Sequence, residues 1–474
     1  MSTNGDATKV VVIGGGVSGL ATAYRVMKAD PSIDVVVLEA NDRPGGKVRS
    51  VQVGDLVLPS GADSFLARKP WAVQLCKELG IGDELVAPGA TGAHLWTARG
   101  LVAMPKQAPF GIPGDIGQVF SWPGLSGAGR RRAALDLLKR KRKDDSDETL
   151  GSLLRRRLGD EATDRAVAPL LAGLYAGDID RLSVRATFPD LQRWESWQGS
   201  LIRGAQAANR QSRKSDPGPM FVRPRGGVDR LTDALTAELG SSVRTHTAVS
   251  AIDATDGRQR VTLGDGTTID ADAVIVSVSA HEASLLMEDL APAAAADLAG
   301  ITYASTGVVL MVYAEGSQAG LPDGTGFVVP RGAAPMTAAT WLSSKWPSDA
   351  FGTRAVARCY VGAVGEEDIL DAADADLIAA CAKHLAALVR LPDLPQHAAV
   401  VRWPKAMPQY ELGHLDLVAR IRRSLPEGIF VVGQAYDGVG IPDCVRAAGE
   451  AADAVVAYLQ RDPAGISNDE ETVR

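Results

Sequence analysis

The sequence predicts an α/β fold that combines a discontinuous domain, a mixed-sheet domain and a helical insertion. Three observations predict it. Residues 9–40 form a strand, a glycine turn, a helix and a second strand, and residues 429–459 form a strand, a glycine-rich loop and a helix. Residues 301–365 alternate short apolar runs with Gly and Pro turns, which is typical of an antiparallel sheet. Because the two strand–glycine–helix patterns lie at opposite ends of the chain, we expect both ends to enter one domain.

Each element follows from local patterns. Lys9–Ile13 is a β-branched run typical of a buried parallel strand, and Val17–Ala29 has helical apolar spacing and ends before Pro31. The Asp265-Gly266 pair predicts a hairpin turn. The other expected elements are a strand at 35–38, helices within 68–86 and 130–165, loops over 87–126, an amphipathic helix within 221–239, strands at 243–251, 259–263, 267–270 and 273–278, a helix at 369–390, a strand at 429–432 and a helix at 444–459.

This order of elements predicts three domains. The first, carrying both glycine-rich patterns, would combine residues 1–90, 221–300 and 400–474. A substrate-binding domain would combine residues 91–130 and 301–399. Residues 131–220, which are helical in composition and highly charged at their start, would form a helical domain.

Composition excludes several classes of protein. A chain of 474 residues is long enough for two or three domains, and its net charge of −7 gives no reason to expect a nucleic-acid partner. The cysteines are scattered, so we expect reduced thiols, no disulfide framework and no metal site. They are Cys76, Cys359, Cys381 and Cys444. The uncharged stretch 10–24 fits a strand–turn–helix better than a signal peptide, and no run is long and apolar enough to span a membrane. We therefore expect a cytoplasmic protein with peripheral membrane contact at most.

The glycine turn after the first strand predicts a Rossmann-like dinucleotide site. Gly14, Gly16 and Gly19 form G-x-G-x-x-G, and Glu39 follows 20 residues after Gly19 at the end of the second strand. Gly14 permits the tight turn, Gly16 lets a pyrophosphate approach the backbone, and Gly19 lets helix and strand pack closely. The helix N-terminus favours phosphate, and the acidic residue accepts a hydrogen bond from a ribose hydroxyl and disfavours NADP.

A second motif favours FAD over NAD. Arg43-Pro44-Gly45-Gly46-Lys47 resembles the R-x-G-G-[RK] motif of flavin amine oxidases, protoporphyrinogen oxidases and carotenoid desaturases. A second G-x-G-x-x-G, expected for an additional NAD(P)H site, is missing from the sequence, because the 438–440 turn lacks the third glycine. This combination is typical of a flavoenzyme that passes its electrons to oxygen or another acceptor.

The C-terminal segment narrows the resemblance. The glycine-rich loop and Pro442 predict a second helix start able to stabilise negative charge on a reduced flavin. Residues 432–444 read V-G-x-x-Y-x-G-V-G-I-P-D-C, which resembles the flavin motif of bacterial protoporphyrinogen and coproporphyrinogen oxidases. Residues 61–70, 173–183 and 402–414 resemble other segments of the same family.

This resemblance implies a flavin site and a reaction. The implied site is Gly14, Gly15, Gly16, Val17, Ser18, Gly19, Glu39, Ala40, Lys47, Gly61, Ala62, Asp63, Ser64, Val249, Trp403, Ile441, Pro442 and Asp443. Asp63 is also the candidate for orienting the substrate, whereas a catalytic triad is not expected. Similar enzymes oxidise a porphyrinogen in three two-electron steps, with O2 as acceptor and H2O2 as product. The implied function is oxidation of coproporphyrinogen III to coproporphyrin III in haem biosynthesis.

Three alternatives stay open at this point. A membrane-associated protoporphyrinogen oxidase would need an exposed apolar patch, for example around residues 110–122. A flavin amine oxidase would need an aromatic cage facing the flavin, and a non-enzymatic flavin-binding partner would consume no oxygen. The basic run 130–143 could attract an acidic substrate, a ferrochelatase or a membrane surface, or form a solvated helical face.

Overall fold

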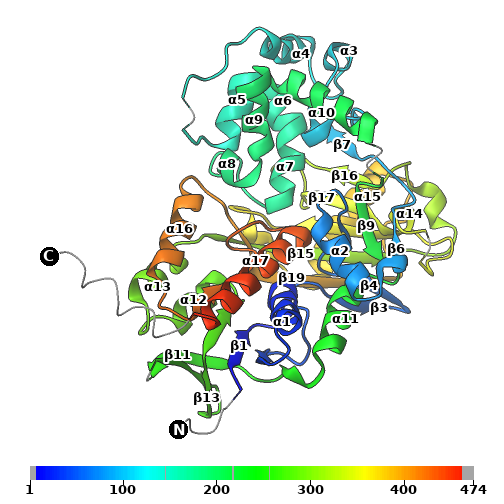
Figure 1. Cartoon of the computed structure of the whole chain (residues 1–474). Coiled ribbons are helices and arrows are strands. Elements are labelled where there is room, and N and C mark those ends of the chain that lie inside the picture. The colour runs from blue at the N-terminus through cyan, green and yellow to red at the C-terminus, as the bar shows by residue number, and fades with distance from the viewer. Residues whose placement is uncertain (1–6, 145, 216–217, 256, 348, 462–474) are drawn as a thin grey trace, which may run out of the picture.

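The computed structural model describes residues 7–144, 146–215, 218–255, 257–347 and 349–461. Its first layer is a five-stranded parallel sheet in the order β10-β2-β1-β14-β20. These strands are β1 (Lys9–Ile13), β2 (Asp34–Leu38), β10 (Val243–Arg244), β14 (Ala273–Val276) and β20 (Ile429–Val431). Three segments far apart in the sequence therefore share one sheet (Figure 1).

Both faces of this sheet are buried, which explains why its strands are almost entirely apolar. Val10 and Val12 face one hydrophobic cluster, and Val11 and Ile13 face another. On the first face pack α1 (Val17–Ala29), α2 (Pro70–Glu78), α11 (Asp229–Leu239) and α17 (Ile441–Leu459). On the second face pack α12 (Ala280–Leu286), α13 (Pro292–Ala299), α16 (His414–Ser424) and a three-stranded sheet of β11 (Val249–Thr255), β12 (Arg258–Leu263) and β13 (Thr268–Ala271).

The second layer is a seven-stranded sheet in the order β19-β15-β18-β17-β16-β7-β8. Its strands are β7 (His94–Thr97), β8 (Gly100–Ala103), β15 (Tyr303–Val312), β16 (Gly326–Val328), β17 (Ala338–Trp341), β18 (Val356–Val361) and β19 (His397–Pro408). The pairs within residues 301–365 are antiparallel, as expected, and the parallel pair of β16 with β7 makes the sheet mixed, which confirms the predicted mixed-sheet domain. Helix α15 (Asp374–Leu388) covers one face, and the hairpin of β3 (Ser50–Val53) and β4 (Leu56–Pro59) packs on the other.

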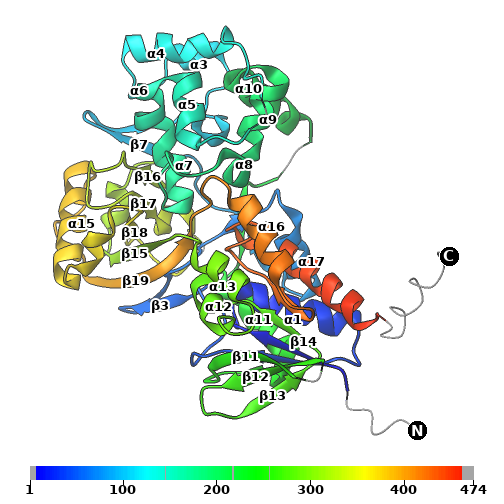
Figure 2. The same cartoon turned by 90° about the vertical axis from the view of Figure 1, so that its left-hand side faces the viewer.

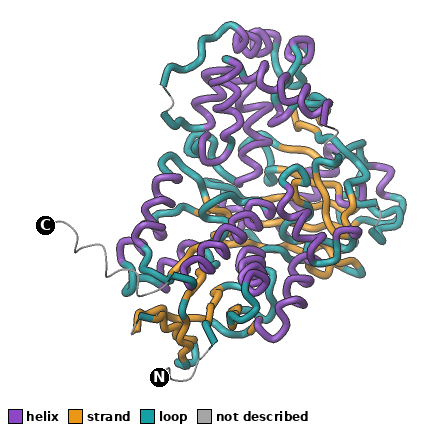
Figure 3. Tube along the Cα trace, viewed as in Figure 1, coloured by secondary structure: helices purple, strands orange, loops and turns teal. Residues whose placement is uncertain are grey.

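The third part is a group of helices at the top of Figure 1, which also stands apart from the sheets in the turned view of Figure 2. They are α3 (Ile116–Phe120), α4 (Gly127–Ala134), α5 (Leu150–Leu158), α6 (Asp160–Ala162), α7 (Ala168–Tyr175), α8 (Val184–Thr187), α9 (Pro189–Gln198) and α10 (Leu201–Ser215). Figure 3 shows this concentration of helix beside the strand-rich layers. Smaller elements are a sheet of β5 (Phe65–Leu66), β9 (Phe221–Pro224) and β6 (Leu85–Val86), and α14 (Leu342–Lys345). None of the helices in the described residues has the length and apolarity needed to cross a membrane.

Three expected elements are wrong in detail. Residues 243–251 form not one strand but β10 and β11, because the amides of His246 and Thr247 donate to the carbonyl oxygens of Asn41 and Glu39. Residues 87–126 are not only loops, since β7 and β8 form a hairpin that extends the seven-stranded sheet. The last helix begins at Ile441 rather than at residue 444, and Pro442 lies in its first turn as expected. The three domain boundaries stay a prediction. Strand β19 lies at the start of the third segment expected for the first domain, and it pairs with β15 in the seven-stranded sheet.

Candidate flavin-binding site

The turn between β1 and α1 leaves space where a phosphate group would lie. Gly14 has a φ of +103°, and a Cβ on Gly19 would lie 2.0 Å from the carbonyl oxygen of Gly14, so neither position tolerates a side chain. A Cβ on Gly16, in contrast, would meet nothing within 4 Å. Gly16 is also the N-cap of α1, and no side chain caps that helix. The uncapped amides and the open space above Gly16 fit a pyrophosphate.

A second glycine loop closes against this turn. The amide of Gly45 donates to the carbonyl oxygen of Gly15 at 2.8 Å, and Gly16 and Gly45 form an isolated parallel bridge. A Cβ on Gly46 would lie 3.2 Å from the Cα of Gly16. The two glycine motifs found in the sequence therefore lie in contact, and the second supports the backbone of the first.

Glu39 joins the glycine turn to the loop after β2. The residue is 6% exposed, and one carboxylate oxygen accepts a hydrogen bond from the amide of Gly15 at 2.8 Å. The other accepts bonds from the amide and the side chain of Asn41 at 2.9 and 2.6 Å. The Glu39 carbonyl oxygen accepts a bond from Thr247, two residues before the half-buried Val249 at the start of β11. Glu39 thus links the glycine turn to the loop after β2 and to the segment that leads to Val249.

The start of α17 lies against the start of α1. Gly440 is the N-cap of α17, and no side chain caps this helix either. The thiol of Cys444 is within hydrogen-bonding reach of Ser18: burial raises the pKa of Cys444 to about 11, and the bond with Ser18 acts in the opposite direction. Asp443 forms an ion pair with Lys69 at 2.6 Å. Two uncapped helix N-termini, one from each end of the chain, therefore converge (Figure 1).

Lys47 connects this region to β19. Its ammonium donates to the carbonyl oxygen of Ala406 at 2.5 Å and to the amide oxygen of Gln434 at 2.8 Å. Burial lowers the pKa of Lys47 to about 8. A Cβ on Gly61 would lie 1.7 Å from the Lys47 carbonyl oxygen, and the indole of Trp403 donates to the carbonyl oxygen of Ser60 at 3.0 Å.

Asp63 is buried in an ion pair that the sequence did not reveal. It is 8% exposed, and the ammonium of Lys345 lies 2.8 Å from its carboxylate, with a further bond from Ser64 at 3.0 Å. Burial alone would raise the pKa of Asp63, but the charges of Lys345 and Arg358 and these hydrogen bonds outweigh it and hold the pKa at about 2. Asp63 is therefore a carboxylate at neutral pH and cannot act as a general acid there.

Sequence reasoning also missed two residues that shape the C-terminal loop. The hydroxyl of Tyr410 donates to the carbonyl oxygen of Gln434 at 2.6 Å and accepts a bond from the amide of Gly438 at 2.8 Å. The ring of Tyr410 stacks on His414, with centroids 3.9 Å apart. Both lie in the 402–414 segment that carried the family resemblance, but only the folded chain shows them supporting the loop before α17.

The basic run 130–143 is partly structural. Arg132 and Lys139 donate to carbonyl oxygens in the last turn of α5, where cations also interact favourably with the helix dipole. Arg131, Arg140 and Lys143 are exposed. The run is thus neither a purely solvated face nor wholly available to a partner.

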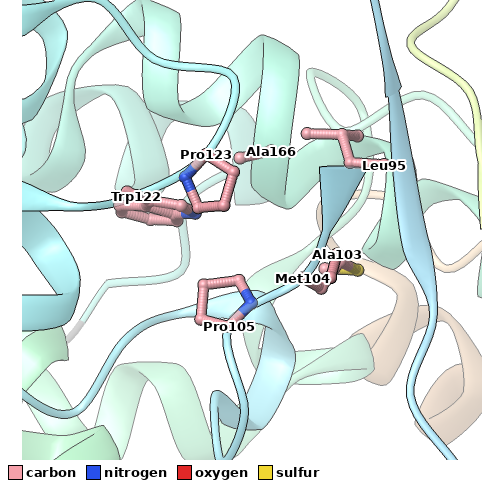
Figure 4. A pocket seen from close by; sticks show the side chains of 7 residues that line it. All are labelled: Leu95, Ala103, Met104, Pro105, Trp122, Pro123 and Ala166. Atoms are coloured by element: carbon pink, nitrogen blue, oxygen red, sulfur yellow. The ribbon is translucent and has the colours of Figure 1, made fainter. Parts of the chain in front are cut away.

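In the described residues, neither the cavity shown in Figure 4 nor a metal centre is a candidate functional site. The side chains in Figure 4 line an apolar cavity. Its volume of about 10 Å³ has room for about one water molecule, and its lining residues are Leu95, Ala103, Met104, Pro105, Trp122, Pro123 and Ala166. Within the described ranges, no cluster of three His, Cys, Asp or Glu residues could hold a metal ion.

A parallel sheet with an open glycine turn, an acidic residue directly after its second strand and a second helix start at the same place is typical of a dinucleotide-binding protein, the flavoproteins among them. The comparison with known proteins agrees. Residues 17–456 match the family described as flavin containing amine oxidoreductase, and the chain belongs to this family. It is an FAD-dependent oxidoreductase.

Individual relatives match over nearly the whole chain. The coproporphyrinogen III oxidase of Bacillus subtilis is 34% identical, over 95% of this chain and 98% of the relative. That of Staphylococcus aureus is 31% identical, over 95% and 99%. A solved structure described as a protoporphyrinogen oxidase, from Exiguobacterium sp., superposes with a TM-score of 0.84 at 30% identity, over 96% of this chain and all of that one.

Proposed function

We propose that the chain oxidises coproporphyrinogen III to coproporphyrin III, with O2 as electron acceptor and H2O2 as product, in haem biosynthesis. The observation that carries this proposal is the near full-length match to bacterial coproporphyrinogen III oxidases at 31–34% identity. The balance is one porphyrinogen and three O2 giving one porphyrin and three H2O2. Protoporphyrinogen IX is the alternative substrate, because the superposed Exiguobacterium structure is described by that activity.

FAD, when bound, supplies the two-electron oxidation, and the protein supplies its binding, orientation and electrostatics. We assign the phosphates to the amides of Val17, Ser18 and Gly19 above Gly16, where the backbone is open. We assign a ribose hydroxyl to the carboxylate of Glu39, which directly follows β2 and bonds to the amide of Gly15. The remaining predicted contacts from the N-terminal half are Gly14, Gly15, Ala40, Lys47 and residues 61–64.

The isoalloxazine end would lie between β19 and the start of α17. Trp403 lies against the 60–64 loop, and the uncapped N-terminus at Ile441, Pro442 and Asp443 offers a positive dipole end to a reduced flavin. Lys47 adds a positive charge at the same place and would stabilise that anion. Val249 is assigned to the adenine end because it follows the strand segment held by Glu39.

The test is an oxidation assay on the FAD-loaded protein under air. Porphyrin fluorescence is followed with coproporphyrinogen III and with protoporphyrinogen IX, and O2 consumption is measured with and without catalase. We expect a higher kcat/KM for coproporphyrinogen III and return of half the consumed O2 by catalase. A higher kcat/KM for protoporphyrinogen IX would make that compound the substrate. Turnover of amines and not of porphyrinogens would show that the protein is an amine oxidase. Binding of FAD without O2 consumption would show that the protein is a non-enzymatic flavin-binding partner.

The proposal includes a cytoplasmic location and a transient contact with a ferrochelatase that receives the product. The exposed members of the basic run, which are Arg131, Arg140, Lys141 and Lys143, support such a contact through their charge. Fractionation of cells and a salt-dependent pull-down with a purified ferrochelatase test the two points. Recovery in the membrane fraction at high salt would contradict the location.

A further inference from the structure

A cluster of buried charges lies on the face of the seven-stranded sheet opposite α15. Arg358 of β18 is 5% exposed, and its Nε and Nη1 atoms have no hydrogen-bond partner. Lys345, at the end of α14, forms its ion pair with Asp63 in the same cluster. Because buried guanidinium donors are costly when unpaired, these two nitrogens are suited to bind an added acceptor group.

The charges of the cluster do not balance. Arg358 and Lys345 each carry a positive charge, and the carboxylate of Asp63 neutralises one of them, which leaves one positive charge. Among the described residues, no carboxylate forms an ion pair with Arg358. The neighbouring Arg223 is already paired with Asp349. The guanidinium of Arg358 lies over the ring of Tyr360, 4.7 Å from its centroid, and a carboxylate would offset the rest of its buried charge.

The position of the cluster relates it to the flavin site. Side chains alternate along a strand, so Arg358, Tyr360 and Val356 share one face of β18, and Val356 packs in the cluster beneath β3 and β4. The register places Tyr360 opposite Val308, which is two residues along β15 from Thr306, the partner of Trp403. Arg358 and Trp403 therefore lie on the same face of the sheet, and Asp63 belongs to the loop that Trp403 contacts.

The cluster is also open at its edge. Thr340 and Tyr360 are partly exposed, and their hydroxyls lie 3.2 Å apart. Lys345 and Ser64 are partly exposed as well. These four side chains offer hydroxyl and ammonium groups at the entrance to the buried guanidinium, which suits a small planar anion.

We propose that Arg358 and Lys345 form a subsite for one propionate carboxylate of the tetrapyrrole. A carboxylate there accepts a charge-assisted hydrogen bond from one of the free nitrogens of Arg358, Nε or Nη1, and brings the cluster to charge balance. The inference rests on the proposed function, since it takes the substrate to be a carboxylated porphyrinogen. It makes Arg358 a residue that selects a propionate over an uncharged substituent.

The test measures binding of coproporphyrin III and of its uncharged tetramethyl ester to FAD-loaded wild type and to Arg358→Met. Fluorescence titration gives both Kd values, and KM for coproporphyrinogen III is measured in parallel. We expect Arg358→Met to raise Kd and KM for the acid roughly 10- to 100-fold, and Kd for the ester less than about threefold. Lys345→Met is expected to act in the same direction.

The matched control is Arg354→Met. Arg354 lies just before β18 but is paired with the exposed carboxylates of Asp55 and Glu315, so its loss should leave both Kd values unchanged. Flavin absorbance and thermal unfolding check that each variant is folded, and Arg358→Lys, which keeps the charge, should recover part of the affinity for the acid. Equal weakening of acid and ester, or loss of FAD from Arg358→Met, would overturn the subsite. If wild type oxidises no coproporphyrinogen, the proposed function fails; if it does and Arg358→Met behaves like wild type, the subsite alone fails.

Discussion

The contrast between Gly16 and Gly19 gives a direct test of the phosphate site. Gly16→Ala places a methyl group in open space, at a φ of −71° that alanine adopts freely. Gly19→Ala places the same group 2.0 Å from the carbonyl oxygen of Gly14. One substitution should therefore affect the cofactor and leave the fold intact, and the other should affect the fold itself.

The magnitudes follow from these contacts. In Gly16→Ala the lower entropy of the unfolded chain and the slightly poorer N-cap nearly cancel, so the free energy of unfolding of the apoprotein should change by about 0.5 kcal/mol or less. The methyl group would hold the pyrophosphate away from the first-turn amides. Loss of one or two charge-assisted bonds of about 1.5–3 kcal/mol each raises the Kd for FAD by at least about tenfold. Gly19→Ala forces β1 and α1 apart and should destabilise the apoprotein by about 3 kcal/mol.

The assay separates the two effects. Apoprotein prepared by removing FAD is unfolded in urea, and the Kd for FAD is measured by quenching of flavin fluorescence. Gly16→Ala should match wild type in the first measurement and differ in the second. A Gly16→Ala protein that binds FAD with the wild-type Kd would show that the phosphates do not lie above this turn, and the assignment of α1 would be refuted.

Three further predictions concern charged residues of the site. Glu39→Gln loses one carboxylate oxygen, so the Kd for FAD should rise roughly tenfold and the free energy of unfolding fall by about 1–2 kcal/mol, measured by fluorescence titration and urea unfolding. Asp63 has a folded pKa of about 2, below its unfolded value, so its ionised form, held by Lys345, Arg358 and Ser64, contributes about 2 kcal/mol above pH 4 that is lost as the pH falls towards 2. The stability difference between wild type and Asp63→Asn should shrink over that range, and a difference independent of pH would contradict the assignment. Lys47 has its pKa lowered to about 8, so the folded apoprotein binds fewer protons than the unfolded chain between pH 8 and 10.5, and its stability should rise there relative to Lys47→Met.

Local patterns predicted the elements that are defined by their own residues. The bounds of β1 and α1 were correct because a β-branched run, a glycine turn and Pro31 mark them within a few residues of chain. The segment 243–251 was wrong because its interruption comes from outside: the loop after β2 takes the amides of His246 and Thr247. The β7–β8 hairpin was missed because its strands are short and gain stability only by extending a distant sheet.

The same distinction holds for the candidate site. The glycines and Glu39 could be proposed from spacing alone, since their neighbours in sequence are also their neighbours in space. Asp63 could be singled out, but its partner Lys345 lies 282 residues away and belongs to no recognisable motif. Arg358 has an unremarkable strand environment in the sequence, and only the packed sheet shows that its guanidinium is buried with two nitrogens unpaired.

The order of strands in the parallel sheet has a consequence for biosynthesis. Strand β1 is made first, but the sheet is completed only when β20 and α17, at residues 429–459, have left the ribosome. At about 5–20 residues per second, the intervening chain takes roughly 20–80 s to translate. During that time β1 and β2 lack α17, one of the helices that cover their first face, so we expect nascent chains to depend on chaperones and the cofactor to enter only after translation ends.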